Sequence, residues 1–419
     1  MNAQQIDDRT FDLDLDHRRL GRQLGLFASN DLVGAGLPLW LPDGAVIREQ
    51  LEQFVVEIER AAGYRRVYSP VLGKRQLYER SGHWQHFRDD MFPPMDVGDE
   101  QLVLRPSNCP HHILIFAAEH RSYRDMPVRL AELATMFRME RSGVLGGLSR
   151  VRAMTLDDAH VFAPPEAVAT EVAAILELID KAFAVLGIVD HHLRLSLRGS
   201  GGHYVDEPAM WDRSEQDLRA ALAASGKPWV EAADEAAFYG PKIDVQVFDA
   251  RGREETLSTV QVDLHQPEVF DLEYQDRDGA RRRPVMIHQS LVSTMERLAA
   301  YLIERYAGAF PVWLAPVQLE IMPLRESHVP AAGALHAAAQ AAGLRCEVAE
   351  PRASLAARIR RAQERKVPFM AVIGDREIAD GTVALRRRGR HDVVTLAPAA
   401  VTARIAELAA RRLPGLELD

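Results

Sequence analysis

The sequence has few cysteines and no long apolar run, and each absence excludes a class of protein. Its 419 residues include only Cys109 and Cys346, which stand far apart. They cannot form the disulfide framework of a small secreted domain, so each is free to be a buried thiol or a metal ligand. No apolar run approaches the roughly 20 residues of a membrane-spanning helix, and the polar, acidic amino terminus is unlike a signal or transit peptide. We therefore expect a cytoplasmic protein without a membrane partner.

The chain also has no excess of positive charge. Its net charge is −9, whereas a surface that binds nucleic acid is usually basic. Acidic residues concentrate near the amino terminus and in residues 231–278, while basic clusters lie at 358–366 and 385–390. Because a charge run is as often a solvated face as a binding surface, these clusters leave binding to nucleic acid open.

The pattern of apolar residues is typical of a globular protein of two or three domains, with 47% hydrophobic and 26% charged residues. Helical spacing predicts helices over 44–63 and 165–187. Short runs rich in β-branched residues predict strands at 101–105, 128–133, 151–155, 193–197, 242–248 and 284–288. Because strands outnumber the helices that could cross between them, an antiparallel sheet is favoured over a doubly wound one.

A domain boundary is predicted near residue 313, which divides the chain into residues 1–313 and 314–419. Beyond it, helices over 329–342, 354–365 and from 398 onward alternate with short apolar runs that predict strands. This alternation predicts a small α/β domain with a mostly parallel sheet. The glycine-rich segment 199–203 is predicted to be a flexible loop.

Three separate segments carry residues that bind metals. Cys109 lies in RPSNCPHHILIF, His160 in LDDAHVF and His288 at the end of PVMIH. One thiolate and two imidazoles make three of the four ligands of zinc, and a site with three protein ligands keeps a position open for water or substrate. Isolated histidines are also common in cores and on surfaces, so spacing alone leaves both interpretations open.

Two further segments carry arginines near glycine or near a helix start. In FRMERSGVLGGLSRVR, Arg138, Glu140, Arg150 and Arg152 flank a glycine-rich connection. Such an arrangement suits polyphosphate, because guanidinium groups fork onto phosphate oxygens, although an exposed hairpin with ordinary charges fits as well. Arg297 begins an apolar helix shortly after His288, which places it close to the metal candidate.

Taken in order, these segments resemble the three signature motifs of class II aminoacyl-tRNA synthetases of the threonyl type. The first predicted helix with YRRVYSP resembles motif 1, with Pro70 at its proline position. Residues 137–152 resemble motif 2, and residues 290–308 resemble motif 3. Phrases such as SNCPHH, DDAHVF and AFYGPKIDV are similar to those of the same family, and the likeness covers nearly the whole chain.

The resemblance implies a fold and a reaction. The fold is α+β, a six- or seven-stranded antiparallel sheet flanked by helices in the catalytic domain, followed by an α/β anticodon-binding domain. The reaction is that of a threonine–tRNA ligase, which uses ATP to activate L-threonine and transfers it to tRNA(Thr). A homodimer through motif 1 is implied, with one Zn²⁺ per subunit and Mg²⁺ bound with ATP.

The resemblance also implies a role for individual residues. Cys109, His160 and His288 would hold the zinc, which binds the amino and hydroxyl groups of threonine. Asp158 would accept a hydrogen bond from that hydroxyl, and Tyr239 would contact the amino group. Several residues would bind ATP. Arg138 would contact the α-phosphate, and Lys242 the reacting phosphate. Glu140 would contact the adenine amino group, and Arg150 and Arg297 the outer phosphate and the adenine face. These cations would stabilise the charge that develops in adenylation.

Two expectations concern the ends of the chain. Glu377 and Arg386 fall where relatives contact anticodon bases, although the family's usual phrase is replaced by PRAS at 351–354. The segment before residue 16 is too short for the editing region of many relatives. We therefore expect no editing of seryl-tRNA by this chain.

Several positions depart from the family pattern and keep other functions open. Leu156 replaces a glutamine, Gly146 a histidine, Ser293 and His111 each a glycine, and Thr256 with Leu257 a more polar phrase. Such changes also fit a resistance copy or biosynthetic enzyme that loads threonine or a related β-hydroxy amino acid onto a carrier protein or another acceptor. A non-catalytic tRNA-binding module is a third possibility, disfavoured by the intact arginines and metal set. His83, in SGHW, fits either the amino-acid pocket or a structural helix end.

Overall fold

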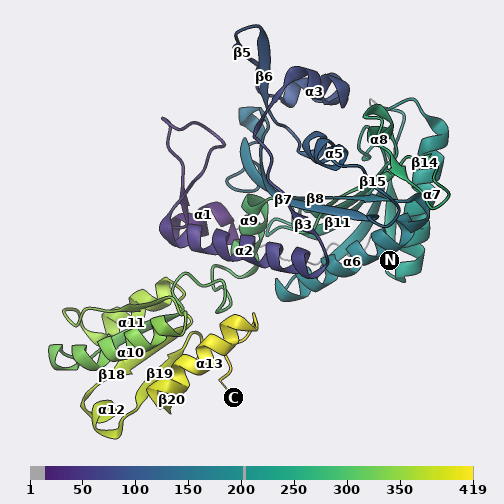
Figure 1. The fold of residues 1–419 in the computed structure, drawn as a ribbon. Helices are drawn as coiled ribbons and strands as arrows, with labels where there is room; N and C mark the ends of the chain where they lie inside the picture. Colours follow the sequence, from purple (N-terminus) through teal and green to yellow (C-terminus); the bar gives the residue numbers. More distant parts are fainter. Residues whose placement is uncertain (1–14, 202–203, 419) are drawn as a thin grey trace. The chain divides into compact units, whose positions relative to one another are not determined.

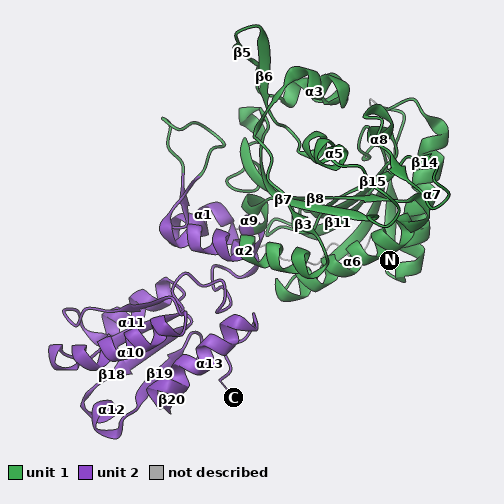
Figure 2. Cartoon of the chain, viewed as in Figure 1, with its two compact units in different colours: residues 1–11, 29–38, 52–298 green, residues 12–28, 39–51, 299–419 purple. Residues whose placement is uncertain are grey.

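The structure is a computed structural model that describes residues 15–201 and 204–418. The polar segment 1–14 and the last two residues of the predicted loop 199–203 lie outside the described residues. The chain forms two compact units that interleave along the sequence (Figure 2). The larger is built mainly from residues 52–298, and the smaller from 299–419 with segments 12–28 and 39–51. Because these units are defined by packing, the predicted division of the sequence at residue 313 stays a prediction.

The larger unit contains an eight-stranded sheet in the order β10-β9-β11-β12-β15-β8-β7-β3. Its strands are β3 Arg65–Arg66, β7 Val128–Phe137, β8 Ala153–Ala163, β9 His191–Ser196, β10 Trp229–Ala232, β11 Lys242–Phe248, β12 Glu254–Asp263 and β15 Val285–Ser290. Five of the seven neighbouring pairs are antiparallel, and the outermost pair at each edge is parallel.

The predicted antiparallel sheet flanked by helices is therefore confirmed, although it has eight strands where six or seven were expected, and its two edge pairs are parallel. The chain crosses over through α7 (Pro208–Ser225) between β9 and β10, and a helical crossover brings the next strand back parallel. Five of the six predicted strands lie in this sheet. The sixth, 101–105, is β6 (Glu100–Leu104) of a separate sheet with β4 (Leu72–Lys74) and β5 (Met95–Val97).

Two predicted helices are present and bury the faces expected from their spacing. The first is α2 (Pro42–Ala61), which buries Ile47, Leu51, Phe54 and Val55. The second is α6 (Val168–Val185), which packs on β8, β12 and β15 and is joined there by α7. Figure 1 shows α6 on one face of the sheet and α5 (Cys109–Ala117) on the other. Thus α5 delivers Cys109 to the face that α6 leaves open.

The rest of the larger unit consists of short elements around this sheet. They are α3 Arg75–Arg80, α4 His83–His86, α8 His265–Val269, β13 Tyr274–Gln275 and β14 Arg281–Arg282. Helix α9 (Met295–Arg305) follows β15 after a turn, as the motif 3 resemblance predicts. The amino-terminal elements α1 His17–Gln23, β1 Phe27–Ala28 and β2 Leu39–Trp40 belong to the smaller unit, as do residues 299–305 of α9. Single 3₁₀ turns lie at 88–90, 142–144 and 165–167 in the larger unit and at 326–328 in the smaller one.

The main part of the smaller unit is an α/β domain with a mixed sheet. Its strand order is β17-β16-β18-β19-β20, from Cys346–Val348, Leu319–Pro323, Phe369–Ile373, Val383–Arg387 and Val393–Leu396. Its helices are α10 Val329–Ala341, α11 Leu355–Glu364, α12 Asp375–Asp380 and α13 Pro398–Ala410, close to the predicted ranges. The core includes Leu319, Ile321, Phe369, Val401 and Ile405.

The prediction of a mostly parallel sheet in this domain is wrong. Strand β16 runs parallel to β17 and β18, but β18–β19 and β19–β20 are antiparallel. The short helix α12 ends at Gly381 in the left-handed conformation (φ 64°), and the chain turns back directly into β19. Without a full crossover helix the next strand returns antiparallel.

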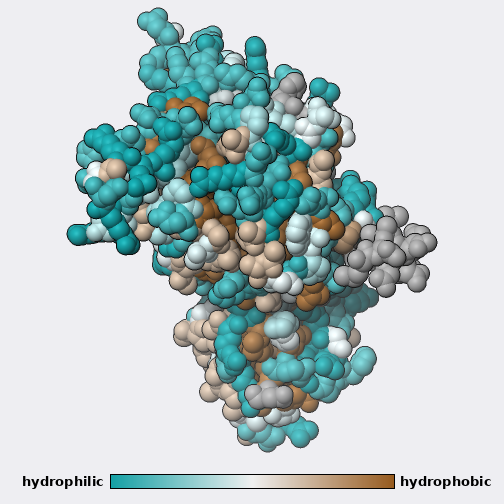
Figure 3. All heavy atoms as spheres, turned by 90° about the vertical axis from the view of Figure 1, so that its right-hand side faces the viewer, coloured by the Kyte–Doolittle hydropathy of each residue, from teal (hydrophilic) through white to brown (hydrophobic). Residues whose placement is uncertain are grey.

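No helix among the described residues is long and apolar enough to cross a membrane. The face in Figure 3 is largely hydrophilic, with apolar atoms visible between polar ones.

Candidate active site

The three predicted metal ligands meet at one place on the sheet. Cys109 is the first residue of α5, His160 lies on β8, and His288 lies directly opposite His160 on the antiparallel neighbour β15. All three are buried, and their ligand atoms lie within 4.8 Å of one another. His160 Nε2 is 3.0 Å from His288 Nδ1. Because zinc binds such atoms at about 2.0–2.3 Å, one ion can bridge this spacing.

Each of the three ligands has a hydrogen-bond partner that leaves one atom for a metal. His288 Nε2 donates to Asp263 Oδ2 at 2.8 Å, which leaves Nδ1 bare. His160 Nδ1 lies 2.8 Å from His112 Nδ1, which turns Nε2 toward His288. The Ser107 hydroxyl lies 3.1 Å from Cys109 Sγ. This arrangement of soft and imidazole donors with outer partners fits a zinc site.

Burial sets the protonation of these groups. It lowers the pKa of His160 well below its usual value, with further lowering by His288 and His112, so the ring is neutral as a metal ligand must be. It raises the pKa of the Cys109 thiol, so a metal must displace a proton there.

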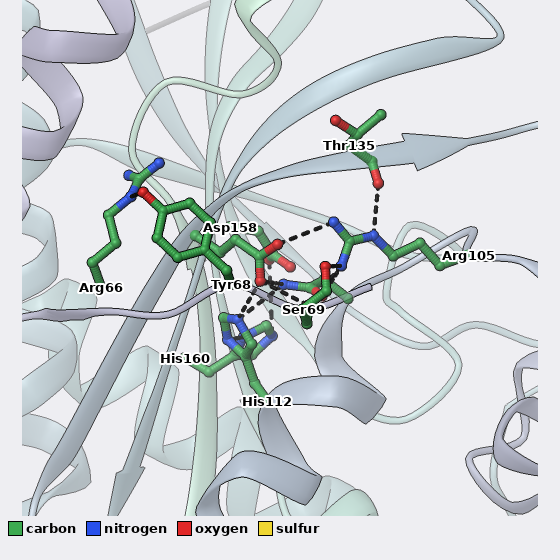
Figure 4. Close-up of polar contacts among 10 residues, drawn as sticks. Arg66, Tyr68, Ser69, Arg105, His112, Thr135, Asp158 and His160 are labelled. Atoms are coloured by element: carbon green, nitrogen blue, oxygen red, sulfur yellow. Dashed lines mark hydrogen bonds and ion pairs between the residues drawn. The ribbon is translucent and has the colours of Figure 1, made fainter. Parts of the chain in front are cut away.

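A network of polar side chains contacts His112, the neighbour of His160 (Figure 4). Glu132 Oε1 accepts from Arg105 Nη2 at 3.1 Å, and its Oε2 accepts from Ser69 Oγ at 2.7 Å and lies 3.4 Å from His112 Nε2. Burial alone would raise the pKa of Glu132, but hydrogen bonds from His112 and Ser69 and the charge and hydrogen bond of Arg105 outweigh it and lower the pKa to about 2. The network therefore holds an ionised carboxylate next to His112.

A cavity of about 340 Å³ opens over His160 and His288. Seven of the predicted site residues line it: Arg138, Asp158, His160, Tyr239, Lys242, His288 and Arg297. Glu140 and Arg150 do not line this cavity. They form an ion pair with each other at 2.9 Å in the motif 2 hairpin.

Asp158 presents an unsatisfied carboxylate to the cavity. Its Oδ1 lies 3.8 Å from His160 Nε2, and its buried Oδ2 has no hydrogen-bond partner within the described part of the chain. Burial, with help from Asp157 and Glu132, raises the pKa of Asp158 well above its usual value. An unpartnered buried polar atom is costly, so it marks a place where a ligand donor fits.

Tyr239 forms the wall next to His288. Its ring stacks on the His288 ring at a centroid distance of 4.9 Å, and its hydroxyl donates to Gln261 Oε1 at 2.6 Å. The pKa of the phenol is raised well above its usual value, mainly by burial, so it stays protonated.

The cavity is also lined by the cations Arg138, Lys242 and Arg297, which we call its cation side. Arg297 donates from Nε to the Ser149 carbonyl and from Nη1 to the Thr256 carbonyl, both at 3.3 Å. Lys242 Nζ lies 3.0 Å from Asp244 Oδ2. The backbone N–H of Arg138 donates to the Arg152 carbonyl at 2.9 Å, closing the hairpin that continues β7 and β8. Guanidinium and ammonium groups around one cavity suit a polyphosphate.

The turn between β15 and α9 borders the same side. Asp157 Oδ2 accepts from the backbone N–H groups of Leu291 and Val292, at 2.7 and 3.2 Å. Ser293 lines the cavity with a left-handed backbone (φ 66°), a conformation that favours glycine. The position at which the family pattern has glycine is thus strained here.

Comparisons with known proteins assign this arrangement to a family. Residues 92–306 match the family described as tRNA synthetase class II core domain (G, H, P, S and T), and residues 318–408 match the anticodon binding domain family. A solved structure described as the RNA binding domain of threonyl-tRNA synthetase from Cryptosporidium parvum is 32% identical, covers 94% of this chain and 98% of its own, and superposes with a TM-score of 0.89. The chain belongs to the threonyl-tRNA synthetase family.

Longer bacterial relatives are also similar. The threonine–tRNA ligase of Oceanobacillus iheyensis is 50% identical over 384 residues, which are 91% of this chain and 59% of the relative. That of Listeria monocytogenes serotype 4a is 49% identical over the same share of this chain and 60% of its own. This member of the threonyl-tRNA synthetase family thus spans about 60% of the length of the curated relatives that it matches.

The departures from the pattern of threonyl-tRNA synthetases fall into two groups. Leu156, Thr256, Leu257 and Ser293 line the cavity. Gly146 lies in the motif 2 hairpin, where its N–H donates to the Arg150 carbonyl, and His111 is buried on α5. Four of the six changed positions therefore line the cavity itself.

Some residues of the site were not predicted from the sequence. His112, Asp263, Ser107 and Gln261 each contact a predicted site residue, and none carried a signal of its own. His83 begins α4, as the helix-end interpretation predicted, and its Nε2 lies 3.5 Å from Cys109 Sγ, but it is not among the residues that line the cavity.

The predicted anticodon residues lie in the smaller unit. Glu377, on α12, accepts the N–H of Gly374 through its Oε2 at 2.9 Å. Arg386, on β19, stands opposite Met370 of β18. Their predicted contacts with RNA bases stay predictions.

Proposed function

We propose that this chain is a zinc-dependent threonine–tRNA ligase. The observation that carries this proposal is the buried trio of Cys109, His160 and His288, of which both histidines line the same cavity as Arg138 and Arg297. A metal with an open position next to a cationic phosphate site is what an enzyme needs to hold a hydroxylated amino acid next to ATP.

The metal side of the cavity would bind threonine. When bound, zinc would supply a Lewis acid with an open position for the amino and hydroxyl groups of the substrate. Asp158 Oδ2, buried without a partner among the described residues, would accept the hydroxyl hydrogen. Tyr239, stacked on His288, would contact the amino group.

The cation side would bind ATP and stabilise its reaction. Attack of the threonine carboxylate on the α-phosphorus builds negative charge, and Arg138 and Lys242 would stabilise that charge together with Mg²⁺. Arg297, held by two backbone carbonyls, would place its guanidinium at the outer phosphate or the adenine face with little reorganisation. Glu140 and Arg150, now paired with each other, would separate to reach adenine and phosphate.

The remaining partners follow from the proposed reaction. The smaller unit, with Glu377 and Arg386, would contact the anticodon of tRNA(Thr), and the segment around Pro70 would form the interface of a homodimer. Because tRNA is charged where proteins are made, the proposed function implies a cytoplasmic location.

The test is threonine-dependent exchange between ATP and pyrophosphate on the zinc-loaded protein, followed in the same tube by charging of unfractionated tRNA. We expect both activities, and we expect neither after treatment with a chelator. Exchange without charging would replace tRNA by a carrier protein or another acceptor. Absence of exchange would contradict an activating enzyme and leave only a binding module.

A further inference from the structure

A buried ion-pair cluster lies next to Lys242 on the face of the large sheet that borders the cavity. Strand β11 pairs with β9 on one side, where Ser196 stands opposite Lys242 and Arg194 opposite Asp244. On the other side, Thr259 of β12 stands opposite Asp244. Side chains that lie opposite each other, or two positions apart on one strand, project from the same face of a sheet. Lys242 and Thr259 line the cavity, so Asp244 and its neighbours on β9 share the cavity face.

Three donors converge on one oxygen of Asp244. Its Oδ2 accepts from Ser196 Oγ at 2.7 Å and from Arg194 Nη2 at 3.2 Å, and Lys242 Nζ lies 3.0 Å away. The Asp244 side chain is 0% exposed, whereas those of Lys242 and Arg194 are 20% and 17% exposed. Because buried charges are screened little by solvent, the charge of Asp244 acts directly on both cations.

The two cations do not depend on Asp244 equally. Arg194 has further acidic neighbours, with Glu235 Oε2 at 3.5 Å and Glu254 Oε2 at 3.8 Å. Among the described residues, Asp244 is the one acidic side chain within ion-pair distance of Lys242. The loss of Asp244 would therefore leave Lys242 without an ion-pair partner, whereas Arg194 would keep two.

The ion pair also suits the role proposed for Lys242. A lysine carries its charge at the end of a flexible chain of four carbons, and its ammonium group has three hydrogens to donate. When one hydrogen points to Asp244 Oδ2, two are left for a phosphate in the cavity. A charge that is held in place before the reaction stabilises the transition state without a cost of reorganisation.

We propose that Asp244 is a positioning residue for adenylation, which holds the Lys242 ammonium group at the edge of the cavity. The Ser196 hydroxyl keeps the carboxylate oxygen directed toward Lys242. Asp244 itself does not line the cavity, so it would act through Lys242 and not by contact with the substrates. This inference rests on the proposed function, because that function assigns Lys242 to the reacting phosphate.

The experiment measures kcat and KM for ATP in exchange between ATP and pyrophosphate, with the zinc-loaded full chain. Asp244→Asn keeps the shape of the side chain and removes its charge. Because a small misplacement of a reacting group can cost about 100-fold in rate, we expect kcat to fall about 10- to 100-fold. KM for ATP should change less than about threefold, because an interaction that matters mainly in the transition state lowers kcat without weakening binding of the substrate.

A double-mutant cycle separates positioning from a structural role. If Asp244 acts through Lys242, Asp244→Asn should lower kcat by less than about threefold in a chain that already carries Lys242→Ala. If Asp244 only supported the fold, the same substitution would lower kcat by the same factor in both backgrounds.

Two further variants control for loss of folding. Arg194→Gln removes an ion pair between β9 and β11 but leaves Lys242 with its carboxylate, so the free energy of unfolding should fall while kcat stays close to the wild-type value. Arg194→Gln combined with Asp244→Asn removes both charges of that pair, which limits the loss of folding. Lys242 still loses its partner in this combined variant, so kcat should fall at least about 10-fold. Urea denaturation reports the stability of each chain.

The outcomes separate this inference from the proposed function. A kcat close to the wild-type value in folded Asp244→Asn or in the combined variant, or an equal loss in both backgrounds of the cycle, would overturn the role of Asp244. Exchange by the wild type would support the proposed function in either case. A wild-type chain without exchange would overturn both, because Asp244 is assigned to that reaction.

Discussion

The metal side and the cation side of the cavity are built differently. On the metal side the His160 side chain is 1% exposed, and each ligand is oriented by another side chain. On the cation side the Lys242 side chain is 20% exposed, and Arg297 is held by backbone carbonyls. A metal requires ligands in one tautomer at fixed positions, whereas phosphate requires mainly charge at the right place. The side with the stricter geometry is therefore the side with more buried side-chain hydrogen bonds.

The largest expected effect tests whether the metal side recognises the hydroxyl group of the amino acid. Valine lacks the hydroxyl that would satisfy Asp158, so its kcat/KM in exchange between ATP and pyrophosphate should be about 10⁴–10⁵ times lower than that of threonine. Serine keeps the hydroxyl and lacks one methyl, so it should fall only about 10- to 200-fold. Initial exchange rates over a range of each amino acid measure both ratios. If kcat/KM for threonine exceeded that for valine by less than about 100-fold, the metal side would not recognise the hydroxyl.

The next effect tests whether the network behind the metal side stabilises the fold. Glu132→Gln leaves Arg105 with an uncompensated buried charge, so the free energy of unfolding at pH 7 should fall by about 3–5 kcal/mol. The exposed pair of Glu100 with Lys74 provides a matched control, because Glu100→Gln should cost less than about 1 kcal/mol. Urea denaturation measures both values.

The same variant has a defined pH dependence. The folded protein lowers the pKa of Glu132 to about 2, so its stabilisation is complete above the pKa of the unfolded chain and is lost as the pH falls toward 2. The difference between wild type and Glu132→Gln should therefore shrink as the pH is lowered from 6 to 3. A difference that stays constant over that range would contradict an ionised Glu132.

A smaller effect tests the cation side by itself. Arg138→Ala removes a guanidinium from the cavity, so kcat for adenylation should fall about 10²- to 10³-fold. Zinc affinity should not change, because Arg138 contributes no ligand atom to the trio. Arg138→Lys should recover only part of the rate, because an ammonium cannot fork onto phosphate. A parallel loss of zinc affinity would show that the two sides are not independent.

The smallest effect concerns the strained turn on the cation side. Ser293→Gly relieves a left-handed backbone, so thermal denaturation should show a gain of about 0.5–1 kcal/mol in stability. Ser258→Gly, in the buried strand β12, should instead lose about the same amount. A loss in both variants would mean that the Ser293 side chain contributes more than its backbone strain costs.

Much of the fold follows from local pattern. The spacing of apolar residues predicted α2, α6, α10, α11 and α13 close to their observed bounds, because one buried face repeats every turn of a helix. The run 242–248 is β11 without any shift. The parallel edges of the large sheet and the mixed sheet of the smaller unit were not predicted, because they depend on how the connections between strands are routed.

The sequence by itself determined which residues are able to hold a metal and phosphates. Cys109, His160, His288 and the motif arginines are of residue types that bind these groups, and they stand in segments that resemble the family motifs. Only the tertiary structure decided how those groups are held. His112 and His160 are 48 residues apart, and His160 and His288 are 128 apart. The proton positions on these rings depend on neighbours that no local pattern places side by side. The residue types that carry the chemistry of the site could therefore be predicted from the sequence, whereas their positions and orientations arise from long-range packing.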